Sequence, residues 1–325
     1  MSDLILALPS KGRLKEQAEA WLADCGFAVQ ASGGARGYRA SIDRLPGVQV
    51  QLLSASDIAA AVDAGEAHLG VTGEDLLRER GEGIDARVML LRPLGFGRAD
   101  VVVAAPKSWI DVDAMADVEE VAAAYLARTG RRLRVATKYL VQTRAFFARH
   151  GVADYRIVES GGATEGAPAA GAAELIVDIT TTGATLDANN LKIIADGVIL
   201  KSEAQLAAGL KAPWTLDQVE TVRFFLRTVE ARARAKGLTA LNWPAGQEAQ
   251  AKAAMQPFLD KGAAFGGAAP GAQGLLTPMK TLFEAANALA ESGIGPAAAS
   301  RPDYVFEPRC VAADTLAERL GFSVV

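Results

Sequence analysis

Short apolar runs alternate with segments of helical pattern along the first two thirds of the chain. Residues 4–8, 48–53 and 68–71 are three such runs, and a helix-like segment follows each. The alternation continues to a long helical pattern over residues 216–235. It is typical of mainly parallel sheets with helices on both faces, so we predict an α/β fold.

Composition and charge exclude several classes of protein. The 325 residues are 50% hydrophobic and 22% charged, which is ordinary for a globular protein, and the length suggests two or three domains. The net charge of −4 does not favour non-specific nucleic-acid binding. The N-terminus lacks the pattern of a signal peptide, and no uncharged apolar run reaches about 18 residues, so we expect a cytoplasmic protein with no membrane span. The two cysteines, Cys25 and Cys310, lie in no C-x-x-C pattern, so neither a disulfide scaffold nor a zinc site is expected.

The strongest motif is the stretch ELIVDITTTGATL at residues 174–186. An apolar strand leads into a tight loop with four threonines and one glycine, and a helix-like segment follows. Such a turn can present backbone N–H groups and hydroxyls to a phosphate, while Asp178 at the strand end can accept from ribose hydroxyls. The simpler interpretation is a threonine-rich turn that only caps a helix. The candidate binding residues are Asp178, Thr180, Thr181, Thr182, Gly183, Ala184 and Thr185.

A second motif places cations where the first strand meets the first helix. Lys11 and Arg13 flank Gly12, and they form either a clamp on pyrophosphate or nucleotide phosphates, or a solvated helix start. Arg39 precedes a strand-like segment and could join them, although local sequence fits an exposed arginine better.

Two further loops follow apolar strands. In residues 70–77, Gly73 clears space for a ligand, whereas the acidic Glu74 and Asp75 need no more explanation than a favourable helix start, worth roughly 0.3–1 kcal/mol each. In residues 159–168, Glu165 is either a first-turn acid or a ligand of ribose or of magnesium-bound pyrophosphate. Neither G-x-x-x-x-G-K-[ST] nor G-x-G-x-x-G is present, so the phosphate chemistry is not of those kinds.

Taken in order, these segments resemble the ATP phosphoribosyltransferase family, which opens histidine biosynthesis. The resemblance covers roughly residues 4–235. The segments that carry it are Pro9 to Leu14, residues 70–77, residues 95–97, residues 136–139 with Thr143, Arg144, Phe146 and Phe147, Glu165 with Ala167 and Pro168, and residues 178–191.

The resemblance implies a two-lobed core like a type II periplasmic binding protein. One domain would comprise residues 1–97 and 193–236, the other residues 98–192, with residues 237–325 as a C-terminal extension of unknown role. The loop at residues 180–185, with Asp178 and Glu165, would bind 5-phosphoribosyl pyrophosphate. The implied catalytic residues are Lys11, Arg13 and Arg39, on the side of ATP and pyrophosphate, and the implied ATP-binding residues are Gly73, Lys138 and Tyr139.

The implied reaction is attack by adenine N1 of ATP on the anomeric carbon of phosphoribosyl pyrophosphate, with inversion. Pyrophosphate leaves together with Mg²⁺, the expected cofactor, whose protein ligands the sequence does not identify. No Ser or Cys triad is required, because alignment can contribute on the order of 7–11 kcal/mol and cations near the leaving group add more.

Two departures from the family pattern affect assembly and binding. Long members end in a ferredoxin-like histidine-binding domain, whereas residues 237–325 indicate helices at 247–259, 278–291 and 312–320 and a single short strand at 304–306. We therefore expect a short-form enzyme with a mostly helical extension, forming a homo-oligomer and a hetero-oligomer with a regulatory subunit similar to histidyl-tRNA synthetase. In addition, Ser54 stands where many relatives have arginine.

Two alternative functions fit parts of the sequence. One is a non-catalytic cytosolic solute-binding or sensor protein of the same two-lobed fold. The other is a phosphoribosyltransferase for a different base. It fits less well, because type I enzymes usually carry two acidic residues shortly before the loop, and here only Asp178 lies there.

Overall fold

The computed structural model describes residues 3–31, 39–266 and 272–323, without the side chains of Ala31, Arg39 and Ala272. The chain forms two compact units. The larger unit comprises residues 1–23 and 27–214, and the smaller unit residues 24–26 and 215–325.

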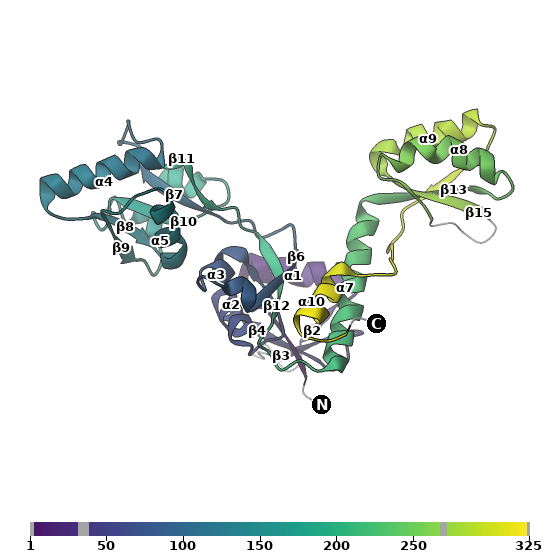
Figure 1. The fold of residues 1–325 in the computed structure, drawn as a ribbon, viewed down its shortest axis with the longest axis horizontal. Helices are drawn as coiled ribbons and strands as arrows, with labels where there is room; N and C mark the ends of the chain where they lie inside the picture. The colour runs from purple at the N-terminus through teal and green to yellow at the C-terminus, as the bar shows by residue number, and fades with distance from the viewer. Residues whose placement is uncertain (1–2, 32–38, 267–271, 324–325) are drawn as a thin grey trace. The chain divides into compact units, whose positions relative to one another are not determined.

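The first sheet of the larger unit has seven strands and is parallel at its centre. In spatial order the strands are β2 (Val29–Ala31), β3 (Arg39–Ile42), β4 (Val48–Leu53), β1 (Leu4–Pro9), β5 (Leu69–Gly73), β12 (Ala204–Gly209) and β6 (Val88–Pro93). β1 pairs in parallel with β4 and β5, while the flanking strands pair antiparallel. The helices attached to this sheet are α1 (Gly12–Asp24), α2 (Ala55–Ala64) and α3 (Glu74–Arg78), and a 3₁₀ turn spans Ile84–Ala86 (Figure 1). Ile58 and Val62 of α2 pack with Leu77 of α3 against Ala7 and Ala207 of the sheet.

The second sheet has five strands, in the order β11 (Leu191–Leu200), β7 (Asp100–Pro106), β10 (Leu175–Thr180), β8 (Leu133–Thr137) and β9 (Tyr155–Glu159). The strands β10, β8 and β9 are parallel, and β7 runs antiparallel between β10 and β11. The accompanying helices are α4 (Met115–Thr129), α5 (Leu140–Arg149) and α6 (Ala184–Ala188), with a 3₁₀ turn at Thr164–Gly166.

The central strands β7 and β10 of the second sheet are buried on both faces, which explains why they contain continuous apolar runs. Val177 faces the cluster that holds Met115 of α4 and Phe147 of α5, while Ile176 faces the cluster that holds Leu186 of α6. The chain passes between the two sheets twice, after Pro93 and after Leu200. The α/β class and the two-lobed core are confirmed, although the alternation of elements did not predict the antiparallel strands. The domain limits expected from the resemblance remain a prediction.

The smaller unit begins with the long helix that the sequence predicted. Helix α7 (Leu216–Lys236) starts in a capping box, in which the Thr215 hydroxyl accepts from the Gln218 N–H and the Gln218 side chain accepts from the Thr215 N–H. Helix α10 (Val311–Arg319) packs on α7, and Asp314 of α10 forms an ion pair with Arg223 of α7.

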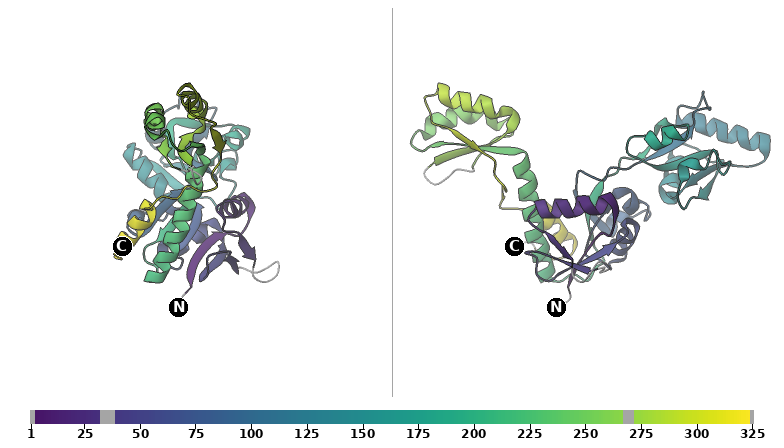
Figure 2. Two further views of the ribbon diagram at one scale, coloured as in Figure 1. Left: turned by 90° about the vertical axis from the view of Figure 1, so that its right-hand side faces the viewer. Right: turned by 180° about the vertical axis from the view of Figure 1, so that it is seen from behind.

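The rest of the smaller unit is a four-stranded antiparallel sheet covered by two helices. The elements follow the order β13 (Leu238–Pro244), α8 (Glu248–Leu259), β14 (Ala264–Phe265), β15 (Ala272–Pro278), α9 (Met279–Glu291) and β16 (Ala298–Ser300). In space the strands lie in the order β14-β15-β13-β16, which is the βαββαβ arrangement of ferredoxin-like domains. Helices α8 and α9 lie on one face of the sheet, as Figure 2 also shows, and Met255 and Leu289 pack there with Trp243 and Leu275 of the strands.

This sheet corrects the sequence analysis. Helices do supply more residues of the extension than strands, but the prediction of a single strand at residues 304–306 is wrong, because that segment is not a strand and four other segments are. The strands were missed because two are very short and the others are interrupted by alanine, glycine and proline, which are uncommon in strands. Among the described residues, no helix combines the length and apolar character needed to span a membrane.

The core of the smaller unit generates a first prediction. Trp243 is 1% exposed and donates from Nε1 to Gln273 Oε1 at 3.0 Å. We expect Trp243→Ala to lower the free energy of unfolding of this unit by roughly 3–5 kcal/mol, because it empties a large buried volume. Urea unfolding followed by circular dichroism measures the change. Phe283→Ala is the matched control, since Phe283 on α9 is 70% exposed and its loss should change stability by less than about 0.5 kcal/mol.

Candidate functional site

The threonine-rich loop lies between the carboxyl end of β10 and the start of α6. Gly183 adopts φ +78°, a left-handed conformation that favours glycine, while a Cβ atom there would meet nothing within 4 Å. The requirement for glycine is therefore conformational. The Thr180 hydroxyl accepts from the Gly183 N–H at 2.8 Å, and the Thr182 hydroxyl accepts from the Ala184 N–H at 3.4 Å.

These bonds shape the loop but occupy two of the amides that a phosphate could use. The Thr181 hydroxyl donates to the carbonyl oxygen of Arg98 at 3.0 Å, which anchors the loop to the segment that crosses between the sheets. Thr181, Thr182, Ala184 and Thr185 are exposed. The loop thus presents threonine side chains to solvent from a turn held by its own hydrogen bonds.

Asp178 lies at the carboxyl end of β10, just before this loop. One of its oxygens accepts from the Ile179 N–H at 2.8 Å. Burial raises the pKa of Asp178 above its usual range and the Glu165 carboxylate adds to this, while the Ile179 N–H, the Lys138 ammonium and Thr164 act in the opposite direction. The structure therefore brings Asp178, Glu165 and Lys138 close enough to interact at one end of the second sheet.

Lys138 and Tyr139 follow β8 but have different surroundings. Lys138 is exposed, with its ammonium 5.1 Å from the centre of the Tyr139 ring. Tyr139 is 1% exposed, and its hydroxyl donates to Asp75 Oδ2 at 2.7 Å. Burial and the Asp75 carboxylate raise the pKa of the Tyr139 phenol, which therefore stays protonated.

The Asp75 carboxylate joins the two sheets at this point. It is 5% exposed, and its second oxygen accepts from the Ser202 hydroxyl at 3.0 Å. Next to it, Glu79 accepts from the N–H groups of Val141 and Gln142 at 2.7 and 3.2 Å, so that a carboxylate from the end of α3 caps the start of α5. Sequence reasoning missed this role of Asp75 and Glu79, because their partners lie more than 60 residues away.

The absence of a side chain at Gly73 leaves room for the Asp75 carboxylate, in addition to any room for a ligand. A Cβ atom at Gly73 would lie 2.2 Å from Asp75 Oδ1, so no larger residue fits while Asp75 keeps its position. The space that sequence reasoning assigned to a ligand is thus partly required by a neighbouring carboxylate.

Lys11 and Arg13 are exposed at the carboxyl end of β1 and the start of α1. Because β1 runs parallel to β5, they lie at the same edge of the first sheet as Gly73. In the described part of the chain, no hydrogen bond or ion pair joins either cation to the loop at residues 180–185. The side chain of Arg39 lies outside the described residues.

Ser54, which stands where many relatives have arginine, caps α2. Its hydroxyl accepts from the Asp57 N–H at 3.2 Å and donates to Asp57 Oδ2 at 2.6 Å. Serine is a favourable residue for this position, so the departure has a structural reason.

The arrangement groups candidate residues at the carboxyl ends of parallel strands in both sheets, which is where open α/β sheets bind ligands. The edge of the first sheet provides cations, and the edge of the second provides the threonine loop and two carboxylates. The bond between Tyr139 and Asp75 connects the two edges.

Asp178 and Glu165 are the carboxylates at this edge that suit Mg²⁺. Among the described residues, no group of three or more His, Cys, Asp or Glu side chains could hold a metal ion by itself. Mg²⁺ usually binds through one or two carboxylates together with substrate phosphates and water. Asp178 and Glu165 fit that pattern, because their mutual repulsion would be relieved by a cation.

The junction generates a second prediction. Tyr139→Phe should lower the free energy of unfolding by about 1–3 kcal/mol, because it removes a hydrogen bond from a buried carboxylate. Urea titration of the full chain measures this change. Glu120→Gln is the control, since Glu120 is exposed on α4 and its loss of charge should change stability by less than about 0.5 kcal/mol. Unchanged stability of Tyr139→Phe together with a raised KM for ATP would instead support the direct ATP contact expected from the resemblance.

Asp178 generates a third prediction. Because its folded pKa is raised, its stabilising contribution is present below the ordinary aspartate pKa and is lost as pH rises through the raised value. Asp178→Asn should therefore melt at a higher temperature than the unsubstituted chain near pH 8, with a difference that shrinks as pH falls towards about 4. Calorimetry across this range measures it, and Asp111→Asn, at an exposed position, should show no such trend.

Comparisons with known proteins identify the family. The sequence model described as ATP phosphoribosyltransferase matches residues 54–228. A relative from Caulobacter vibrioides, named ATP phosphoribosyltransferase, is 65% identical over 319 residues, covering 98% of each chain, and one from Nitrobacter winogradskyi is 50% identical over 311 residues, covering 94% of this chain and 95% of the relative. Among solved structures, the ATP phosphoribosyl transferase (HisG:HisZ) complex from Thermotoga maritima matches with a TM-score of 0.53 and 25% identity, covering 70% of this chain and 96% of that one. The chain therefore belongs to the ATP phosphoribosyltransferase family, which opens histidine biosynthesis.

Proposed function

We propose that this chain condenses ATP with 5-phosphoribosyl pyrophosphate to give N1-(5-phosphoribosyl)-ATP and pyrophosphate. The observation that carries the proposal is the loop at residues 180–185, with Asp178 before it, at the carboxyl end of β10 in a chain of this family. A sugar phosphate matches this pair, because threonine hydroxyls suit the phosphate and a carboxylate suits the ribose hydroxyls.

In this proposal the loop binds the 5-phosphate and Asp178 binds the ribose. The exposed hydroxyls of Thr182 and Thr185 donate to phosphate oxygens, while the Thr181 hydroxyl donates to the Arg98 carbonyl oxygen and anchors the loop. Thr180 and Gly183 maintain the turn through their mutual hydrogen bond, and Ala184 begins the short helix beyond it. The raised pKa of Asp178 reflects the free-energy cost of holding a carboxylate at this place, which its binding role explains.

The cations at the other edge would act on ATP and on the leaving pyrophosphate. Lys11, Arg13 and Arg39 are proposed for this role, with Lys138 supplying a further cation next to Asp178. Gly73 would lie near the nucleotide. Tyr139 is buried, so we propose that it acts as a positioning residue that holds Lys138 and the junction in place.

Magnesium would be held by Asp178 and Glu165 together with the substrate. When bound, Mg²⁺ would offset negative charge on pyrophosphate. The chain's own residues then orient the substrates so that adenine N1 faces the anomeric carbon, opposite the leaving group. Because adenine N1 is the nucleophile, no protein nucleophile is needed. The protein has to align the two substrates and neutralise the negative charge on the leaving pyrophosphate.

The loop generates a fourth prediction. Gly183→Val should raise the KM for phosphoribosyl pyrophosphate on the order of tenfold, because a β-branched residue at φ +78° is strained by about 1–3 kcal/mol and will displace the turn. Pyrophosphate release in the presence of ATP and Mg²⁺ measures this. Gly171→Val is the matched control, since Gly171 has φ +66°, also faces open space and lies outside the loop.

The same assay tests the alternatives. A solute-binding or sensor protein of this fold would bind a ligand but release no pyrophosphate from the two substrates. If Gly183→Val and Gly171→Val raised the KM for phosphoribosyl pyrophosphate equally, the proposal that the loop binds the phosphate would be contradicted.

The smaller unit is proposed to make the chain responsive to histidine by itself. The expectation of a short-form enzyme rested on the lack of a ferredoxin-like domain, and the βαββαβ sheet removes that premise. The match to the Caulobacter vibrioides relative covers 98% of each chain, so it extends over the smaller unit as well. A regulatory subunit similar to histidyl-tRNA synthetase stays a second candidate, favoured by the likeness of the core to a HisG:HisZ complex. A homo-oligomer and a cytoplasmic location are also proposed.

Histidine binding generates a fifth prediction. Calorimetric titration of the full chain, without any partner, should detect histidine binding, and a chain ending at residue 236 should lose it. The pyrophosphate-release assay, run on both chains, shows whether the shortened chain still folds and turns over. Binding only after a histidyl-tRNA-synthetase-like subunit is added would favour the second candidate.

A further inference from the structure

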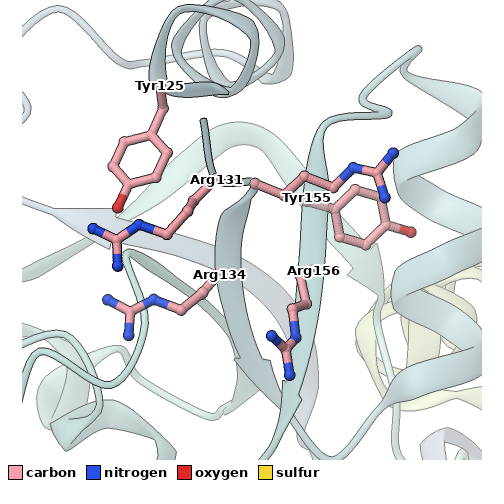
Figure 3. Close-up of a pocket in the computed structure, with 6 residues that line it drawn as sticks. Tyr125, Arg131, Arg134, Tyr155 and Arg156 are labelled. Atoms are coloured by element: carbon pink, nitrogen blue, oxygen red, sulfur yellow. The ribbon is translucent and has the colours of Figure 1, made fainter. Parts of the chain in front are cut away.

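A second cluster of charge lies at the other end of the five-stranded sheet. A recess of about 570 Å³ opens at the amino ends of β8 and β9. Its lining residues are Tyr125, Arg131, Arg132, Arg134, Tyr155 and Arg156. Figure 3 shows that Arg131 and Arg134 extend in the same direction below Tyr125, while Arg156 projects from the neighbouring strand.

Two of these arginines are forced together by the sheet. Arg134 and Arg156 are register partners on the parallel strands β8 and β9, so their side chains leave the same face of the sheet from backbones about 4.8 Å apart. Like charges placed directly opposite each other on neighbouring strands destabilise a sheet. An anion bound between the two guanidinium groups would therefore offset their repulsion.

Within the described residues, Glu174 is the one carboxylate that forms a hydrogen bond or ion pair with these arginines. Glu174 accepts from Arg134 Nη2 at 2.6 Å and from the Tyr125 hydroxyl at 3.2 Å. The guanidinium groups of Arg131, Arg132 and Arg156 are exposed and, within the described ranges, form no hydrogen bond or ion pair. Four guanidinium groups thus line the recess, and one of them is paired with a carboxylate.

The recess is separate from the threonine loop. Glu174 precedes β10, and Thr180 ends it. A six-residue strand spans roughly 17–20 Å, so the two places lie at opposite ends of the sheet. A ligand of ribosyl-phosphate size held by the loop does not reach these arginines.

We propose that this recess binds a small ligand that carries a chain of two or more phosphate groups. Guanidinium forks pair with phosphate oxygens in a bidentate manner, and arginines here converge from the α4–β8 connection and from two strands. The volume lies in the range of small-molecule sites. A concave recess with its charges this close together suits a compact polyanion better than an extended acidic surface.

The test uses inorganic tripolyphosphate as the probe and the full-length chain as the protein. Calorimetric titration should detect binding that weakens with added KCl, since the attraction is electrostatic. The double variant Arg131→Gln, Arg156→Gln should raise the Kd for tripolyphosphate at one class of sites by about tenfold or more, because hydrogen bonds to charged groups are lost. Both residues are exposed and without ion pairs in the described part of the chain, so the variant should fold, which circular dichroism checks.

Two controls locate the site. Arg128→Gln removes the same kind of charge from exposed α4 outside the recess and should leave the affinity unchanged. Hydrogen exchange should show that tripolyphosphate protects residues 131–134 and 154–158 in the unsubstituted chain but not in the double variant. Phosphate bound at the threonine loop would instead protect residues 178–186 in both proteins.

Two outcomes would overturn the proposal. The first is tripolyphosphate binding that the double variant leaves unchanged. The second is binding of an oligoglutamate peptide, but not of tripolyphosphate, at residues 131–134, which would make the recess a docking surface for an acidic protein segment.

Discussion

The buried carboxylate of Asp75 connects three parts of the larger unit. It accepts from Tyr139 of the second sheet and from Ser202 of the second crossing segment, and it belongs to the helix that follows β5 of the first sheet. A buried carboxylate that loses its donors is costly, so these bonds hold the carboxyl ends of β5 and β8 at the same junction. Gly73 is required because any side chain there would displace Asp75. The proposed substrate groups on both edges depend on this junction for their positions.

The proposed binding residues of the second sheet carry a cost in stability. Asp178 is half-buried beside Glu165, and its raised pKa shows that its ionised form is disfavoured where a ribose hydroxyl or a cation would stabilise it. The threonine loop similarly uses a left-handed glycine and its own hydroxyls to keep an exposed turn in shape. Sites that bind charged substrates commonly carry such costs in the free protein. Substrate binding at this loop would offset them.

The smaller unit changes the interpretation of regulation. Its helices α8 and α9 cover one face of a sheet that includes strands of two and three residues. The ferredoxin-like order of these strands removes the ground for expecting a chain without such a domain. The arginine recess, at the opposite end of the second sheet from the loop, would add a second point of contact with phosphate-bearing metabolites.

Apolar periodicity and turn residues act over a few neighbouring positions, so the order of residues alone was enough to predict the α/β class, the long helix α7 and the motif at residues 174–186. The sequence motifs also identified the family. The folded chain was needed to show that Tyr139 is buried against Asp75, that Glu79 caps α5, and that Arg134 lies beside Arg156, since each contact joins residues far apart in the chain. The same holds for the ferredoxin-like sheet, whose short strands, rich in alanine and glycine, form through pairing with one another and through packing under α8 and α9. Local preference is too weak to specify such strands, and long-range hydrogen bonds and burial supply what it lacks.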